Sequence, residues 1–389
     1  MPSVLNRIAL GLAIAVGVYA AVLGALLTPY LQRFALYAHK INTLFLHDID
    51  SGEQFGFAKN QVTPFNIRTP DGETLYAWHV LPIDVYARNE LSLLEEKRPD
   101  GMVQDFTTTE AFRLLTSDET VRVVVNSQGW RPDTYRSLTA QPNTHVLTID
   151  YRGFGKSTGS PTEAGLITDG VALVNWVLHV AKIPPEHIVI LGQSLGTAVA
   201  AAVGLEFANA GNVKKDEDRK QPLLRSYSSD VTHPTTFAGI IVVAPFYDLP
   251  SLLLTYRIGG FLPLLLPLRP FPSLARMLTS RVADTWPTAE RLAAYYGSFG
   301  DHSGARTAMG SLQVMHAVDD GDISFLQTGM ICRRMLGAKC VGLESPAVVE
   351  VKEEGRPKVR MEILEYGGHN RVVTYSSVAG AVLRAFEGL

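Results

Sequence analysis

The residues Gly192-Gln193-Ser194-Leu195-Gly196 fit the pattern G-x-S-x-G, which can carry a nucleophilic serine. The preceding segment HIVIL is apolar and typical of a strand, and the following segment GTAVAAAVGLEFA is typical of a helix. A sharp strand-to-helix turn crowds the backbone beside the serine, so glycines on both sides are favoured. The first N–H groups of the helix would also lie near the serine hydroxyl. We interpret Ser194 as a candidate nucleophile, and a purely structural turn is the alternative.

A serine hydroxyl is a weak nucleophile at neutral pH and needs a base. His369 lies in the sequence EYGGHN, just after the last apolar strand segment, where Gly367 and Gly368 allow the loop to bend. We therefore predict that His369 is the base. The histidines inside other predicted strands and helices are expected to be structural: His145, His179, His187 and His316.

The base in turn needs an acid that fixes its tautomer and stabilises the imidazolium. The sequence MHAVDDGDIS places three aspartates at the end of a predicted strand: Asp319, Asp320 and Asp322. The order serine, aspartate, histidine along the chain is the one expected for a nucleophile on a strand-to-helix turn. Spacing alone does not choose among the three aspartates.

Regular elements must bring these residues together, because Ser194 and His369 are far apart in the sequence. A predicted hairpin at 63–82 is followed by an alternation of strands and helices. The strands are apolar runs rather than strict alternations, as in a sheet buried on both faces. We predict an α/β fold with a mostly parallel central sheet and helices on both faces. The predicted strands are 121–125, 145–150, 187–191, 237–246, 311–318 and 359–366, and the predicted helices are 165–181, 196–208 and 372–386.

Three segments interrupt this alternation. Residues 83–120 and 209–235 are partly or wholly polar and are predicted to be surface insertions, the first of them of low order. Residues 247–300 include the very apolar stretch 249–278, which prolines and Arg257 make a poor membrane span. We predict that 247–300 forms a lid with an acyl pocket facing a bilayer. Ordinary helices packed over the sheet are the alternative.

The N-terminal segment differs from the rest of the chain. Residues 8–31 form an uncharged run that would span about 36 Å as a helix, enough to cross a bilayer core. A signal peptide has an apolar region of only about 7–15 residues. We therefore predict an uncleaved, single-pass transmembrane anchor at 8–31, a juxtamembrane segment at 32–60 and a catalytic domain at 61–389. Arg7 lies on one side of the run and Arg33 on the other, so the orientation is not readable.

The overall composition excludes several classes of protein. The chain of 389 residues is 46% hydrophobic and 19% charged, so it can build a core. A formal net charge of −3 gives no case for nucleic acid binding. Cys332 and Cys340 are too few for a disulfide-dense scaffold or a four-cysteine zinc site. We expect two free thiols, while a single bridge would be possible in an oxidising compartment.

Over roughly residues 61–389 the chain resembles the α/β-hydrolases. The segments that carry the resemblance are Gly192–Gly196, DYRGFGKSTG (150–159), HAVDDGDIS (316–324) and GGHN (367–370). Within that family the chain is similar to the membrane-anchored monoacylglycerol and lysophospholipid lipases of the abhydrolase domain-containing protein 12 type, in particular their fungal relatives.

The resemblance implies hydrolysis of a carboxylic ester of a lipid, with no metal or organic cofactor. The family pattern places its acid four residues after the strand-end histidine, which favours Asp320 over Asp319 and Asp322. The partners that it implies are a lipid ester and a bilayer, and no nucleic acid. An endomembrane location, the endoplasmic reticulum, is expected. Protein partners are not readable from the sequence.

The loop after Val125 departs from the family pattern. In this fold one oxyanion donor is the N–H after the nucleophile, here Leu195, and the second comes from that loop. Relatives usually carry His-Gly there, whereas this chain has NSQGW. We predict that the N–H of Ser127 or Gln128 substitutes. Since losing one donor typically costs about 10²–10³ in turnover, two alternatives stay open: a hydrolase of another ester or peptide, and a catalytically weak binding protein.

Overall fold

The computed structural model describes residues 4–39, 47–96, 101–126, 131–210, 234–258, 262–263, 265–299, 310–343 and 346–388. Within these ranges, nine strands form one sheet in the order β1-β2-β4-β3-β5-β6-β9-β11-β10. Their bounds are β1 Val62–Arg68, β2 Thr74–Val80, β3 Arg122–Asn126, β4 Thr144–Ile149, β5 Ile188–Gln193, β6 Gly239–Val243, β9 Ser311–Ala317, β10 Ala347–Val351 and β11 Lys358–Leu364. The six strands from β4 to β11 are parallel, and β1, β2 and β10 are antiparallel additions at the edges.

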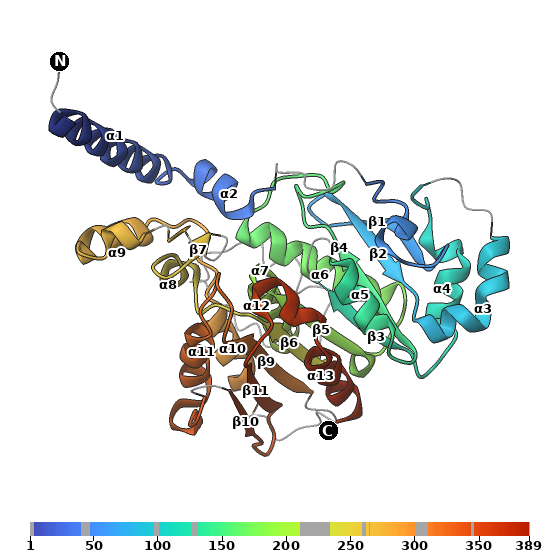
Figure 1. Cartoon of the computed structure of the whole chain (residues 1–389). Coiled ribbons are helices and arrows are strands. Elements are labelled where there is room, and N and C mark those ends of the chain that lie inside the picture. The colour runs from blue at the N-terminus through green and yellow to red at the C-terminus, as the bar shows by residue number, and fades with distance from the viewer. Residues whose placement is uncertain are drawn as a thin grey trace.

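Helices cover both faces of the sheet, as Figure 1 shows. One face packs against α6 (Glu163–His179), α7 (Leu195–Asn209), α10 (Thr288–Gly297) and α11 (Leu326–Leu336). The other packs against α5 (Pro132–Thr139) and α13 (Ser376–Glu387). Successive residues of β5 alternate between the two cores, so the strand has no polar face. The predicted α/β fold, with a mostly parallel sheet and helices on both faces, is confirmed.

Residues 83–120 differ from the predicted low-order surface insertion. They contain α3 (Ile83–Glu95) and α4 (Glu110–Thr116). Leu93 and Leu115 are fully buried in the same core as the central strands. Charged residues lie between the two helices. For that reason the apolar residues that recur at helical spacing were not recognised as two buried helices. Most of the other predicted insertion, residues 211–233, lies outside the described residues.

The N-terminal apolar run is not one helix through residue 31. It forms α1 (Val4–Ala25) and, after a break, α2 (Pro29–Tyr37). Thr28 is extended, with φ −90° and ψ 130°, because the residue before a proline disfavours the helical conformation. The 22 residues of α1 still span about 33 Å. It is the one helix in the described ranges that is long and apolar enough to cross a membrane.

The predicted lid, 247–300, divides into two parts. Its first part contains α8 (Leu249–Leu253), the short hairpin β7 (Arg257–Ile258) and β8 (Leu262–Pro263), and α9 (Pro272–Thr279). Figure 1 shows α9 projecting from the body of the domain on the same side as α1. Its second part is α10, which packs against α7 as an ordinary covering helix. The alternative of plain packing helices describes α10, Leu249 and Leu252 of α8 are also buried in the main core, and the lid stays a prediction.

The expectation of two free thiols was wrong, because Cys332 and Cys340 form a disulfide. Cys332 lies near the end of α11, and Gly337 then reverses the chain with a φ of 57°. This turn brings Cys340 back beside the helix, with the two Cα atoms 5.6 Å apart. The edge strand β10 was also missed, because no residue of its AVVEV segment is fully buried.

Candidate active site

Ser194 lies at the sharp turn between β5 and α7. Its φ of 51° and ψ of −124° are unusual for a residue with a side chain, and such a conformation costs on the order of 1–3 kcal/mol. The Ser194 N–H donates to Val243 O at 3.0 Å, which ties the turn to β6. A Cβ at Gly192 would come within 2.2 Å of the Gly196 carbonyl oxygen. The turn therefore requires glycine at that position, as the motif predicted.

His369 lies in α12 (Gly368–Arg371), directly after β11. Its Nε2 is 3.0 Å from Ser194 Oγ, although 175 residues separate them. Two hydrogen bonds hold the loop in place: Gln193 Nε2 donates to His369 O at 2.5 Å, and Gly368 N donates to Asp319 Oδ1 at 2.7 Å. The base candidate is thus fixed from both the nucleophile strand and the aspartate loop.

Of the three aspartates, Asp320 is the one whose carboxylate reaches the histidine. Its Oδ2 is 2.8 Å from His369 Nδ1. Its Oδ1 accepts hydrogen bonds from the N–H groups of Asp322 and Ile323, at 2.9 and 2.8 Å. Because a carboxylate can only accept, the proton of His369 belongs on Nδ1. That tautomer leaves Nε2 free to accept the proton of Ser194, which is the state a general base needs.

His316, predicted to have a packing role, also supports Asp320. His316 Nε2 lies 2.9 Å from Ile323 O and 3.3 Å from Asp320 Oδ2. Since both of these oxygens accept, the network assigns the proton of His316 to Nε2, and Nδ1 accepts from the Thr328 hydroxyl at 2.8 Å. Sequence spacing could not reveal this support, because it depends on the turn after β9.

The electrostatics of the site keep Asp320 ionised. Burial by itself raises the pKa of the Asp320 carboxyl, but hydrogen bonds from His316 and His369 and the positive charge that these rings can carry lower that pKa well below its usual range. An ionised Asp320 can stabilise a protonated His369 during a reaction.

Of the residues predicted to supply oxyanion donors, Leu195 lies within the described ranges. Leu195 begins α7 and is half-buried beside Ser194, so its N–H is at the N-terminus of a 15-residue helix. Ser127 and Gln128 lie outside the described residues, and their role stays a prediction. Asn126 is the last residue of β3, not the first of the loop. Within the part of the chain that the structure describes, its fully buried side chain has no hydrogen-bond partner.

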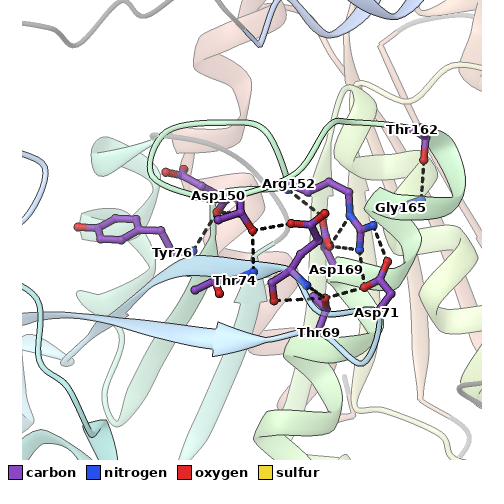
Figure 2. A network of polar contacts seen from close by, with 12 residues as sticks. Thr69, Asp71, Thr74, Tyr76, Asp150, Arg152, Thr162, Gly165 and Asp169 are labelled. Atoms are coloured by element: carbon purple, nitrogen blue, oxygen red, sulfur yellow. Dashed lines mark hydrogen bonds and ion pairs between the residues drawn. The ribbon is translucent and has the colours of Figure 1, made fainter.

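The segment DYRGFGKSTG, quoted above for its family resemblance, has a structural contact network (Figure 2). The Arg152 guanidinium bridges Asp71, in the β1–β2 turn, and Asp169, in α6, with N–O distances of 2.6 to 3.1 Å. Arg152 N also donates to Asp169 Oδ2 at 2.8 Å. Burial raises the pKa of Asp169 to about 6 even with Arg152 beside it. The network joins the antiparallel edge to the parallel sheet.

A metal centre is not apparent in the described ranges, which contain no group of three or more histidine, cysteine, aspartate or glutamate residues placed to hold an ion.

Comparison with known proteins gives this arrangement a family. The family model described as "Alpha/beta hydrolase family" matches residues 123–385, well over half of the chain. The chain belongs to the alpha/beta hydrolase family. A solved alpha-beta hydrolase from Vibrio vulnificus superposes with a TM-score of 0.55 at 13% identity, over 91% of this chain and 93% of that one. At this identity the likeness supports the fold of the hydrolase and nothing finer.

Two curated relatives are similar to parts of this alpha/beta hydrolase. Lysophosphatidylserine lipase ABHD12 from Danio rerio is 23% identical over 220 residues, which cover 57% of this chain and 54% of that protein. Protein bem46 from Schizosaccharomyces pombe is 31% identical over 118 residues, covering 28% and 40% of the two chains. The chain spans about half or less of the length of these relatives, which are distant homologues.

Proposed function

We propose that this protein is a serine hydrolase that cleaves carboxylic esters of lipids through an acyl-enzyme on Ser194. The observation that carries the proposal is the continuous hydrogen-bonded series from Ser194 Oγ through His369 to Asp320, built on a strained strand-to-helix turn. Such a series is the arrangement that activates a serine hydroxyl.

In the acylation half of the reaction, Ser194 Oγ attacks the ester carbonyl carbon while His369 Nε2 takes the hydroxyl proton. The carbonyl oxygen becomes an oxyanion, which the N–H of Leu195 is placed to stabilise. Asp320 stabilises the imidazolium that forms. When the oxyanion collapses, the bond to the alcohol breaks, and His369 gives its proton to the departing alcohol oxygen.

In the deacylation half, water takes the place of the alcohol. His369 Nε2 removes a proton from the water as its oxygen attacks the acyl-enzyme carbonyl. The second oxyanion collapses with cleavage of the bond to Ser194 Oγ, and His369 returns the proton to that oxygen. The products are an alcohol and a fatty acid, and the enzyme is regenerated.

A lipid substrate is supported by two features. The apolar segment that contains α8 and α9 connects β6 to β9 in the sequence. It begins at the carboxyl end of β6, the same end of the parallel strands at which Ser194 follows β5 and Asp320 follows β9. Helix α1 is apolar and almost entirely exposed in the structure, as expected of a membrane anchor. The last turns of α1 also pack beside this segment through Leu23. A monoacylglycerol or lysophospholipid is the proposed substrate class, and the printed name of the Danio rerio relative agrees with a lipid.

The disulfide bears on the orientation. Disulfides persist in oxidising compartments and are rare in the cytosol. Because Cys332–Cys340 lies in the catalytic domain, we place that domain on the lumenal side of an endomembrane, such as the endoplasmic reticulum. Treatment of intact microsomes with protease should spare the domain, and its digestion without detergent would overturn this placement.

The enzymatic proposal is tested with a fluorophosphonate probe, which forms a covalent bond with an activated serine. The wild-type protein should label and Ser194→Ala should not, while Ser117→Ala, at an exposed helix end, serves as the matched control. An unlabelled wild type would exclude the enzyme and favour the catalytically weak binding protein. Hydrolysis of a monoacylglycerol, a lysophospholipid and a short soluble ester then separates lipid esters from other substrates.

A further inference from the structure

Helix α9 has an apolar side that nothing in the described residues covers. Phe271, Leu274 and Met277 are 59%, 39% and 43% exposed. Residues three apart lie on neighbouring positions of a helix, so Leu274 and Met277 form a continuous stripe. On the opposite side Ala275 and Thr279 are buried against the protein. The helix therefore has two apolar sides. One, with Ala275, packs against the protein, and the other, with Leu274 and Met277, is exposed.

The buried side of α9, opposite the exposed stripe, shares a cluster with the proposed anchor. Leu23 packs in one cluster with Leu265, Leu268 and Ala275. Leu23 is two residues, or about 3 Å along the helix axis, from the end of α1, so this cluster joins Ala275 of α9 to the last turn of α1. If α1 spans the bilayer, α9 is at the depth of the boundary between head groups and acyl chains, where interfacial helices bury their apolar side by about 5–10 Å.

Hydrogen bonds fix the segment that follows α9 to α2, the helix that follows the proposed anchor. Helix α2 is bound to the segment that follows α9, because Gln32 donates to Arg281 O at 2.9 Å and accepts from Ala283 N at 2.8 Å. Asp284 is paired with Arg33 at 3.1 Å and accepts from the Tyr37 hydroxyl at 2.9 Å. The lid base and the end of the anchor therefore move together.

The charge of this region matches a membrane surface that carries negative head groups. Residues 265–283 contain no acidic residue and three arginines: Arg269, Arg276 and Arg281. All three are exposed, and none forms an ion pair with another described residue. Basic residues on the polar side of an interfacial helix are attracted to anionic lipid head groups.

We infer that α9, with its stripe Phe271, Leu274 and Met277, is an interfacial membrane helix that dips into an anionic phospholipid bilayer beside the anchor. This inference deepens the proposed function and rests on the anchor proposed there. It gives the lid a partner, because α9 then contacts the acyl-chain layer of the bilayer rather than water. A lipid ester could then enter the site without leaving the membrane.

Spin labels test the inference without any need for activity. The full-length chain carries its native cysteines in a disulfide, so single cysteines can be labelled at Leu274→Cys and Met277→Cys. The chain is reconstituted in phosphatidylcholine bilayers with and without phosphatidylserine. We expect both labels to become accessible to oxygen and protected from a water-soluble nickel chelate, more strongly when phosphatidylserine is present. Leu91→Cys, on the 79% exposed Leu91 of α3, is the control that should stay in water.

A further label at Ile14→Cys, in α1, separates the two proposals. If Ile14 is in the bilayer while positions 274 and 277 are as accessible to nickel as position 91, the inference about α9 is wrong and the anchor stands. If Ile14 is itself in water, the anchor of the proposed function is wrong, and the inference falls with it. Labels at 274 and 277 that are shielded from both reagents and broadened by a neighbouring label would mean a second copy of the chain, which also overturns the inference.

A functional measurement completes the test. The variant Phe271→Ser/Leu274→Ser/Met277→Ser should lose about tenfold in kcat/KM toward an ester embedded in anionic vesicles. Because the three side chains are 59%, 39% and 43% exposed, the free energy of unfolding of the variant is measured together with its rate. Leu91→Ser is the matched control and should keep the wild-type rate. An unchanged rate in the triple variant would contradict the inference.

Discussion

Two buried aspartates of this molecule have opposite pKa shifts. Asp320 lies in the loop after β9, and hydrogen bonds from two histidine rings hold the pKa of its carboxyl below the usual range despite burial. Asp169 lies in α6, is fully buried, and has a pKa raised to about 6 although it contacts a guanidinium. Burial raises the pKa of both carboxyls, but two histidines lower the pKa of Asp320, whereas Asp169 has Arg152 and the like charge of Asp71 beside it.

The donors of the two carboxylates come from different sources. Asp320 accepts from two backbone N–H groups, and both His316 and His369 lie within 3.3 Å of it. Among the described residues, the hydrogen bonds to Asp169 come from Arg152, which divides its guanidinium between Asp169 and Asp71. The comparison teaches that one charged neighbour does not replace solvation, whereas several convergent donors do. The arrangement around Asp169 suits a joint between two parts of the sheet, and the arrangement around Asp320 suits a carboxylate that must stay ionised.

The largest expected effect is on turnover. Asp320→Asn keeps the size of the side chain but can donate to His369 Nδ1, which favours the wrong tautomer of the base. We expect kcat to fall by about 10⁴ with a lipid ester. Steady-state kinetics on the purified variant measures this. A variant within tenfold of wild type would mean that Asp320 does not orient His369.

The next effect is on stability. Arg152→Met leaves Asp169 buried without its charged partner, so we expect the free energy of unfolding to fall by about 3–5 kcal/mol. Urea denaturation measures the change. The matched control is Arg88→Met, which removes an exposed ion pair with Asp84 and should cost less than about 1 kcal/mol. If the two variants unfold alike, the network of Figure 2 is not a structural joint.

The pH dependence of stability should distinguish the two aspartates. The folded pKa of Asp169 is raised, so its contribution is full below its unfolded pKa of about 4 and is lost as the pH rises through about 6. Relative to Asp169→Asn, the wild type should lose up to about 3 kcal/mol across that window. The folded pKa of Asp320 is lowered, so its contribution is present above pH 4 and is lost on acidification. Unfolding curves at several pH values measure both slopes, and slopes of the same sign would refute the comparison.

The smallest effect concerns the neighbour of the acid. Asp319 accepts from Gly368 N but does not contact the His369 ring. Asp319→Asn keeps an acceptor of similar shape, so we expect kcat/KM to fall by less than about tenfold. The same assay that tests Asp320→Asn measures it. A loss as large as that of Asp320→Asn would show that the position of the loop, not the carboxylate on Nδ1, limits the reaction.

The local parts of the site were readable from the sequence, and its tertiary parts were not. The Ser194 turn was predicted because its glycines and flanking periodicities are adjacent in the chain. The choice of Asp320 needed the family pattern, since three aspartates share one loop. The support from His316 depends on the fold of that loop around Ile323, which no spacing encodes. The predicted roles of Ser127 and Gln128 stay predictions.

The prediction of the fold was right where apolar runs were long, and it failed where charged residues interrupted them. The central strands are buried on both faces, so their hydrophobicity was continuous. Helices α3 and α4 are separated by a charged segment and were taken for a surface insertion. The N-terminal run was predicted to be one helix because hydropathy does not register the effect of Pro29 on Thr28.

The position of His369 after β11 has a consequence for inactivation. The candidate base is separated from its acid by 49 residues and from its nucleophile by 175, so the site exists only while β11 stays paired with β9. Proteins open locally at a lower free energy than they unfold globally. A transient opening of the segment from β11 to α13 would detach the base while the remaining core stayed folded. Heat inactivation and amide exchange of this C-terminal unit should therefore run in parallel, ahead of the global melting transition.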